Sequence, residues 1–148
     1  MSDHRPPRYL KPMNKMMMAV QKFGIPTGPA MVLTVPGRKS GQPRSTPMTP
    51  FEFDGGLYVV AGYPGADWAA NARAAGTGKL SRGRRSRPVK IVELTAAQAR
   101  PVLRAFPIHV PVGVAFAKRS GMVVDGTSDE FEALAGRLTV FRFDPVPN

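Results

Sequence analysis

The sequence contains no cysteine and only two histidines, His4 and His109, among its 148 residues. The absence of cysteine excludes disulfide bonds and thiolate chemistry, and it fits a reducing compartment. With so few histidines, a zinc cluster or a Ser-His-Asp triad is hard to assemble, so we expect no metal site. No apolar run is long enough to span a membrane, and the N-terminus lacks the pattern of a secretory signal. These absences predict a cytoplasmic protein.

Acidic residues are also scarce. The 10 aspartates and glutamates are outnumbered by 21 lysines and arginines, which gives a formal net charge of +11. Such an excess implies an anionic partner: nucleic acid, an anionic membrane surface or a polyanionic small molecule. The contents of hydrophobic residues (43%) and charged residues (21%) are ordinary for a globular protein. At this length we expect one domain over residues 1–148, in which residues 1–12 are mobile.

The hydrophobic pattern predicts short strands. Residues 30–62 and 77–95 are expected to be extended, and a last strand is expected at 137–143. The strongest hairpin signal is Asp54-Gly55-Gly56, because Asp-Gly favours the positive φ angles of a tight turn. Pro47 and Pro50 indicate an edge strand or a bulge.

Helices are predicted between and after these strands, at 66–75, at 96–106 and at about 128–136. Thr95 and Gln98 resemble a capping box, and Pro101 predicts a kink or a restart of the second helix. Residues 107–127 are the segment that the sequence defines least. Because few crossover helices separate the strands, we expect an α+β fold with a mainly antiparallel sheet or barrel and a few packed helices.

An N-terminal helix is predicted over residues 13–23. Its apolar face, at helical spacing, consists of Met13, Met16, Met17, Val20 and Phe23. The ordinary interpretation is a helix that covers the core, with its methionines filling gaps. A basic helix of this kind could instead cover a ligand pocket or rest on the inner face of a membrane, so peripheral membrane contact stays open.

The most informative segment is Gly37-Arg38-Lys39-Ser40-Gly41-Gln42-Pro43-Arg44, which lies between two extended runs. Its two glycines loosen the backbone, and its cations lie close to a hydroxyl and an amide. Such a turn can surround a phosphate or a carboxylate cluster with N–H groups and cationic side chains. The spacing fits neither a Walker loop nor a dinucleotide-binding Gly-x-Gly-x-x-Gly. It predicts an anion-binding loop, with an exposed basic hairpin turn as the alternative.

Several motifs follow this loop in order: x-x-Pro, the Asp-Gly-Gly hairpin, Val-Val-Ala-Gly, and a helix carrying Trp-x-x-Asn. Together with the loop, over residues 28–106, they resemble the deazaflavin-dependent nitroreductase and quinone reductase family. The resemblance implies a split β-barrel that binds coenzyme F-420, an 8-hydroxy-5-deazaflavin with a ribityl phosphate and an oligoglutamate tail. It also implies hydride transfer from the reduced cofactor to a small-molecule acceptor, either a quinone, a nitro compound or an activated alkene.

The resemblance implies particular cofactor-binding residues. The phosphate-and-tail loop corresponds to Arg38, Lys39, Ser40, Gln42 and Arg44, and the segment against the ring to Ser45, Thr46, Pro47 and Met48. The backbone facing the deazaflavin corresponds to Ala61, Gly62 and Tyr63, the helix contacts to Trp68 and Asn71, and the candidate catalytic residue is Tyr63. A cofactor with several carboxylates and a phosphate accounts for a basic protein. A cofactor that carries the reaction accounts for the lack of a convincing acid–base or metal constellation.

Other functions remain open on the sequence. The same fold could bind flavin mononucleotide (FMN) or carry a cofactor without catalysis, although the loop offers more positive charge than one phosphate requires. A nucleic-acid-binding domain is the alternative from another class, because a basic stretch is formed by Lys79, Arg82, Arg84, Arg85, Arg87 and Lys90. That stretch has no interleaved aromatic residues, so we interpret it as a solvated hairpin and expect no nucleic-acid partner.

Overall fold

The structure is a computed structural model that describes residues 30–146, so residues 1–12 and the helix predicted over 13–23 lie outside the described residues. Within this range the strands form one sheet in the order β2-β1-β5-β6-β7-β4-β3, and every neighbouring pair is antiparallel. The strands are β1 (Met31–Pro36), β2 (Pro43–Met48), β3 (Phe51–Phe53), β4 (Gly56–Val60), β5 (Thr77–Arg82), β6 (Arg85–Glu93) and β7 (Val140–Pro145). The expectation of a mainly antiparallel sheet is confirmed.

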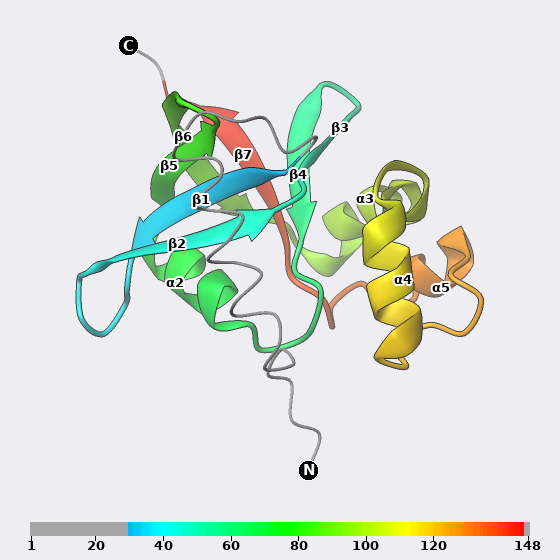
Figure 1. The fold of residues 1–148 in the computed structure, drawn as a ribbon. Coiled ribbons are helices and arrows are strands. Elements are labelled where there is room, and N and C mark those ends of the chain that lie inside the picture. Colours follow the sequence, from blue (N-terminus) through cyan, green and yellow to red (C-terminus); the bar gives the residue numbers. More distant parts are fainter. Residues whose placement is uncertain (1–29, 147–148) are drawn as a thin grey trace.

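The helices of the described range are α2 (Asp67–Ala75), α3 (Ala96–His109), α4 (Pro111–Arg119) and α5 (Ser128–Glu132). Figure 1 shows α3, α4 and α5 gathered at one end of the molecule, while α2 lies beside the hairpin formed by β1 and β2. The molecule therefore has a hairpin end, which contains β1, β2 and α2, and a helical end, which contains α3, α4 and α5.

Local turn chemistry sets the hairpins as predicted. Asp54 and Gly55 have positive φ angles of 49° and 80°, and the register pairs Phe53 with Gly56 across the turn. The strand that contains Pro47 is β2, which lies at one edge of the sheet, so the edge predicted from this proline is confirmed.

The helix α3 differs from the prediction. Its capping box is confirmed, because the Thr95 side chain accepts from the backbone N–H of Gln98 and the Gln98 side chain accepts from the backbone N–H of Thr95. The helix does not restart at Pro101, however, and it continues to His109. Pro101 removes only one helical hydrogen bond, the one to the carbonyl of Ala97. Pro101 and Ala97 both lie on the exposed side of the helix. Burial of the opposite face keeps the helix continuous.

The segment 107–127 contains α4, a helix that the sequence did not predict. Pro111 occupies its first turn, where a missing N–H costs no helical bond. At Gly113 an added Cβ would lie 2.3 Å from the ring of Phe106, so only glycine lets α4 approach α3 this closely. The helix α5 is shorter than predicted and ends at Glu132, whereas β7 (Val140–Pro145) both begins and ends later than the strand predicted at 137–143.

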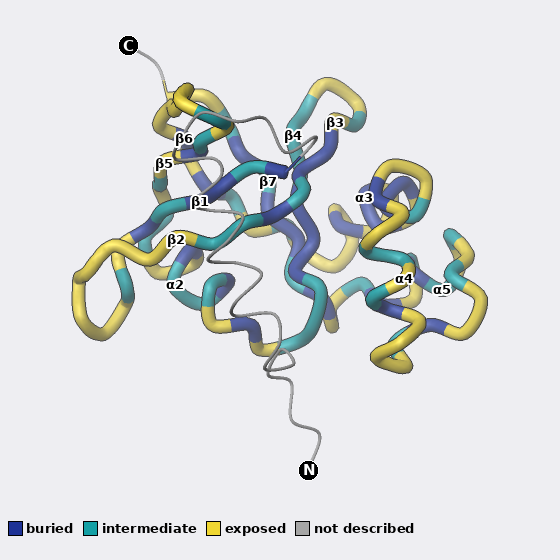
Figure 2. Tube along the Cα trace, viewed as in Figure 1, coloured by how far each residue is buried: buried dark blue, intermediate teal, exposed yellow. Residues whose placement is uncertain are grey.

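The buried side chains form two clusters on opposite faces of the sheet. Adjacent residues show the division: Val59 and Phe141 belong to the cluster beneath α2, whereas Val60 and Val140 belong to the cluster beneath α3, α4 and α5. Successive residues of a strand point to opposite faces, so β4 and β7 serve both clusters. Figure 2 shows these buried segments in dark blue and the loop between β1 and β2 largely exposed.

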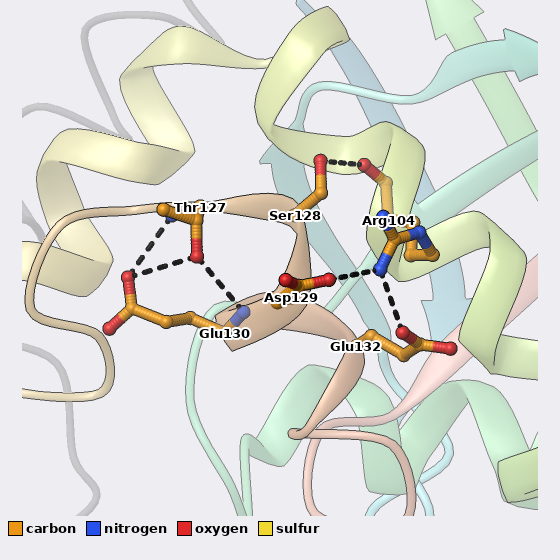
Figure 3. A network of polar contacts seen from close by, with 6 residues as sticks. All are labelled: Arg104, Thr127, Ser128, Asp129, Glu130 and Glu132. Carbon is orange, nitrogen blue, oxygen red and sulfur yellow. Dashed lines mark hydrogen bonds and ion pairs between the residues drawn. The ribbon is translucent and has the colours of Figure 1, made fainter.

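Polar contacts fasten α5 to α3, as Figure 3 shows. The Arg104 guanidinium on α3 pairs with the carboxylates of Asp129 and Glu132 on α5. The Ser128 hydroxyl donates to the carbonyl of Arg104 at 2.8 Å. These contacts are exposed, so they fix the position of α5 more than they stabilise it.

The loop before α5 is organised by one carboxylate. Glu130 accepts backbone N–H bonds from Val124, Asp125, Gly126 and Thr127 at 2.7–3.1 Å. These hydrogen bonds lower the pKa of Glu130 to about 2.

Candidate functional site

The loop between β1 and β2 is a closed turn. Its ends are joined by a hydrogen bond from Gly37 N–H to the carbonyl of Gln42 (2.8 Å), and Gly41 N–H donates to the carbonyl of Gly37 (2.9 Å). Gly41 has a φ of 74°, which glycine adopts without strain. A Cβ on Gly37 would lie 3.3 Å from Nε of Arg44, so the missing side chain leaves room for that guanidinium.

Two residues of α2 fasten this loop. The Oδ1 of Asn71 accepts from the backbone N–H of Arg38 (3.1 Å) and from its Nη1 (2.8 Å). The same Nη1 lies 3.4 Å from the carbonyl oxygen of Asp67, and Nη2 lies 3.5 Å from the Asp67 carboxylate. Residues far apart in the sequence thus meet at the first turns of α2.

A polar groove of about 750 Å³ lies between the loop, β2 and α2. It is lined by Gly37, Arg38, Lys39, Ser40, Pro43, Arg44, Ser45, Thr46, Asp67, Trp68 and Asn71. The residues that line the groove include three cationic side chains and three hydroxyl groups, but only one carboxylate, that of Asp67. Lys39 and Arg44 are exposed and make no ion pair among the described residues.

A second, mainly apolar pocket of about 260 Å³ adjoins the groove. It is lined by Pro47, Met48, Thr49, Val59, Val60, Gly62, Trp68, Phe106, Val110, Val112, Gly113, Phe116, Ala117, Phe131 and Leu138. The helices α3 and α4 supply one wall, and the ends of β2 and β4 supply the other. A Cβ on Gly62 would lie 3.6 Å from the ring of Phe116, so Gly62 marks where the two walls come together.

Trp68 joins the two cavities, because it lines both. Its ring packs at a centroid distance of 5.8 Å from Phe141, a fully buried residue of the sheet. The indole is therefore held by the core while it faces the site.

Most of the predicted cofactor-binding residues come together. The groove holds Arg38, Lys39, Ser40, Arg44, Ser45, Thr46, Trp68 and Asn71, and the apolar pocket holds Pro47, Met48, Gly62 and again Trp68. Gln42, Ala61 and Tyr63 line neither cavity. Ala61 is 1% exposed, and its N–H donates to the carbonyl of Thr139 at 2.9 Å, so its backbone donor is already used.

Tyr63 lies beside the apolar pocket. Its ring centroid is 6.4 Å from that of Phe116, a residue that lines the pocket. Burial, and to a lesser extent the Asp67 carboxylate, raise the pKa of Tyr63 above its usual value, so the hydroxyl stays protonated at neutral pH.

Sequence reasoning missed some of the lining. Asp67 contributes the carboxylate of the groove, and its place at the start of a helix beside Trp68 was the available signal. Val110, Val112 and Phe116 were missed because no helix was predicted in 107–127.

The residues present fit a cofactor with an anionic half and an aromatic half. Guanidinium, ammonium and hydroxyl groups are the donors that phosphate and carboxylates prefer. The joined apolar pocket is suited to a ring or another flat apolar group. In the described residues, no group of three or more acidic or histidine side chains is placed to hold a metal ion.

Solved structures share this fold at low sequence identity. A protein described as a domain-swapped dimer matches with a TM-score of 0.56 and 20% identity, covering 92% of this chain and 99% of the other. An F420-H2 dependent reductase (FDR-A) matches with a TM-score of 0.54 and 20% identity, covering 78% and 94%. A NimC/NimA family protein from Clostridium acetobutylicum matches with a TM-score of 0.52 and 16% identity, covering 88% and 81%. The shared fold is a split β-barrel.

The family follows from the sequence itself. The model of the F420H2-dependent quinone reductase family matches residues 12–123, well over half of the chain. The chain therefore belongs to this family, and it is a reductase that uses reduced coenzyme F-420. No curated protein matches the chain. Within the described part of the chain, no helix has the length and apolar character needed to cross a membrane.

Proposed function

We propose that this reductase transfers hydride from reduced coenzyme F-420 to a quinone, and that it also accepts nitro compounds and activated alkenes. The observation that carries the proposal is the cationic groove that meets an apolar pocket at Trp68. One cavity suits the charged half of the cofactor, and the other suits its ring together with an apolar acceptor.

The groove would hold the phosphate and the oligoglutamate tail. Lys39 and Arg44 are exposed cations at its wall, and Ser40, Ser45 and Thr46 add hydroxyl donors. Charge-assisted hydrogen bonds contribute about 1.5–3 kcal/mol each, which is enough for micromolar binding when several act together.

The apolar pocket would hold the acceptor against the ring. When bound, the reduced deazaflavin supplies the hydride. Met48, Trp68 and Phe116 would exclude water and fix the acceptor, and proximity of the two reactants is the main contribution that such a site makes to the rate. The hydroxyl of Tyr63, whose ring lies beside Phe116 at the edge of the pocket, is a candidate donor for the proton that the reduced acceptor takes up.

The test mixes the purified enzyme with reduced cofactor and, separately, a menadione-type quinone, a nitroaromatic compound and a cyclic enone. Enzyme-dependent return of the oxidised cofactor absorbance is expected with each acceptor. If the protein binds the cofactor tightly but turns over none of the three acceptors, it is a cofactor carrier, and the proposed reaction is refuted. Turnover of the quinone alone would restrict the enzyme to that class.

A pair of lysine variants tests the groove. Lys39→Ala should weaken cofactor affinity by roughly one order of magnitude, as expected for loss of one charge-assisted contact. Lys79→Ala is the matched control, because Lys79 is an exposed lysine on β5 that lines neither cavity. Equal affinities in the two variants would remove the groove from the site.

A further inference from the structure

We infer that Asn71 is a positioning residue, which holds Arg38 against α2 so that Lys39 and Arg44 make the charged contacts to the cofactor. The inference rests on the proposed function, because it assigns separate roles within the same groove. It separates Lys39 and Arg44, which bind the ligand, from Arg38 and Asn71, which shape the loop.

The first observation is that Arg38 is already engaged. Its backbone N–H and its Nη1 both donate to Oδ1 of Asn71, at 3.1 and 2.8 Å. Its Nη2 faces the Asp67 carboxylate at 3.5 Å, and only 32% of its side chain is exposed. The Nη1 donors are therefore used within the protein, and the nearby Asp67 carboxylate offsets part of the guanidinium charge.

The second observation is that Asn71 uses one atom for two donors. An amide oxygen has two lone pairs, and both are directed at Arg38. One of the two bonds goes to the backbone of the loop, so Asn71 determines where residues 37–42 lie relative to α2. The adjacent Lys39 is carried on that backbone.

The third observation is the contrast with Lys39 and Arg44. Both line the groove, both are exposed, and neither is paired with a carboxylate in the described residues. A ligand anion can neutralise these cations without first breaking a bond inside the protein. At Arg38 it would have to compete with Asp67.

Isosteric variants of Asn71 separate positioning from direct contact. Asn71→Asp keeps an oxygen that accepts from Arg38, but it adds a negative charge to the groove. Asn71→Leu has a similar volume and no acceptor. If Asn71 acts by positioning, Asn71→Leu should weaken cofactor binding about tenfold at low salt and by less at high salt, because the displaced loop loses the charged contact of Lys39. Asn71→Asp should bind the cofactor weakly at low salt. Its affinity should return to within about twofold of that of the wild type at high salt, where the added charge is screened.

Calorimetric titration of the cofactor into each folded variant at several salt concentrations gives these affinities. Lys39→Ala and Asn71→Leu should both reduce the salt dependence of binding, because each loses the charged contact of Lys39. If Asn71→Leu does not fold, Asn71→Ala takes its place. An Asn71→Leu protein that keeps the salt dependence of the wild type, or an Asn71→Asp protein that stays about tenfold weaker than wild type at high salt, would mean that the amide itself contacts the cofactor, and the inference would be overturned.

A readout without cofactor separates this inference from the proposed function. Hydrogen exchange of the Arg38 amide in the free protein should quicken in Asn71→Leu and stay slow in Asn71→Asp. If Lys39→Ala and Arg44→Ala leave cofactor affinity unchanged, the groove assignment fails, yet the exchange rates still report on the loop. If the Arg38 amide exchanges equally in all variants, Asn71 does not position the loop.

Discussion

The two cavities that meet at Trp68 are built by opposite means. The groove is walled by a loop and by exposed polar side chains, and the loop is held by two hydrogen bonds that Arg38 donates to Oδ1 of Asn71. The apolar pocket is walled by side chains of the hydrophobic core, including Phe106 and Phe131. Changes in the groove should therefore affect ligand affinity alone, whereas changes in the pocket should affect both stability and turnover.

The largest effect is expected from Phe106→Ala. Phe106 is 6% exposed and packs against Phe131 and Phe51 at centroid distances of 5.2 and 6.1 Å. Loss of this ring should lower the free energy of unfolding by about 3–5 kcal/mol, measured by denaturant titration. The comparison variant Arg44→Ala should change it by less than about 0.5 kcal/mol. Similar unfolding free energies for both variants would break the distinction between the cavities.

Gly62→Val should act on turnover. A first methyl at this position makes an ordinary contact 3.6 Å from Phe116, but the branched side chain would project further into the pocket. We expect turnover of the quinone to fall by about tenfold or more, because a small displacement of the reactants is costly. The charged half of the cofactor should still bind, since the groove is unchanged, so cofactor affinity should fall much less than turnover. Gly62→Ala is the matched control and should remain close to wild type; an equal loss in both variants would indicate a backbone effect instead.

Arg44→Ala should act on affinity. Removing this exposed cation should weaken cofactor binding by roughly one order of magnitude at low salt. Raised salt should weaken binding by wild type more than by the variant, because one screened contact is missing. Arg100→Ala, an exposed arginine of α3 outside both cavities, serves as the control for net charge. A salt dependence that Arg44→Ala leaves unchanged would contradict a direct contact.

The smallest effect concerns the helical end alone. The pKa of Glu130 is lowered on folding from 4.5 to about 2, so its carboxylate stabilises the fold above pH 4.5 and loses that contribution as the pH falls toward 2. The difference in melting temperature between wild type and Glu130→Gln should be a few degrees at neutral pH and should shrink across this window. A difference that stays constant between pH 7 and pH 3 would show that the charge is not involved.

Sequence reasoning succeeded where the determinants are local. The turn at Asp54 and Gly55 and the capping box of Thr95 and Gln98 are each decided within four residues, and all appear as predicted. The basic loop between β1 and β2 was found from its own composition. The family motifs indicated most of the residues that line the groove, but of those that line the apolar pocket only Pro47, Met48, Gly62 and Trp68.

It failed where the determinants are distant or tertiary. The continuity of α3 through Pro101 depends on burial of the opposite face, which outweighs a local break. The helix α4 is recognised only once Gly113 is seen to pack against Phe106. The hydrogen bond from Arg38 to Asn71 joins residues 33 positions apart, and no local sequence pattern predicts it.

The prolines of β2 have a consequence for association between molecules. β2 is an outermost strand of the sheet, and Pro43, Ser45 and Pro47 alternate along it. A proline has no N–H to give to β1, so it is accommodated where the strand turns its donors outward. Of these three residues, which direct their backbone N–H positions outward, only Ser45 has an N–H to donate. One donor is too few for another chain to pair with β2 and extend the sheet. The strand whose residues Pro43 and Ser45 line the groove is therefore poorly suited to edge-to-edge aggregation.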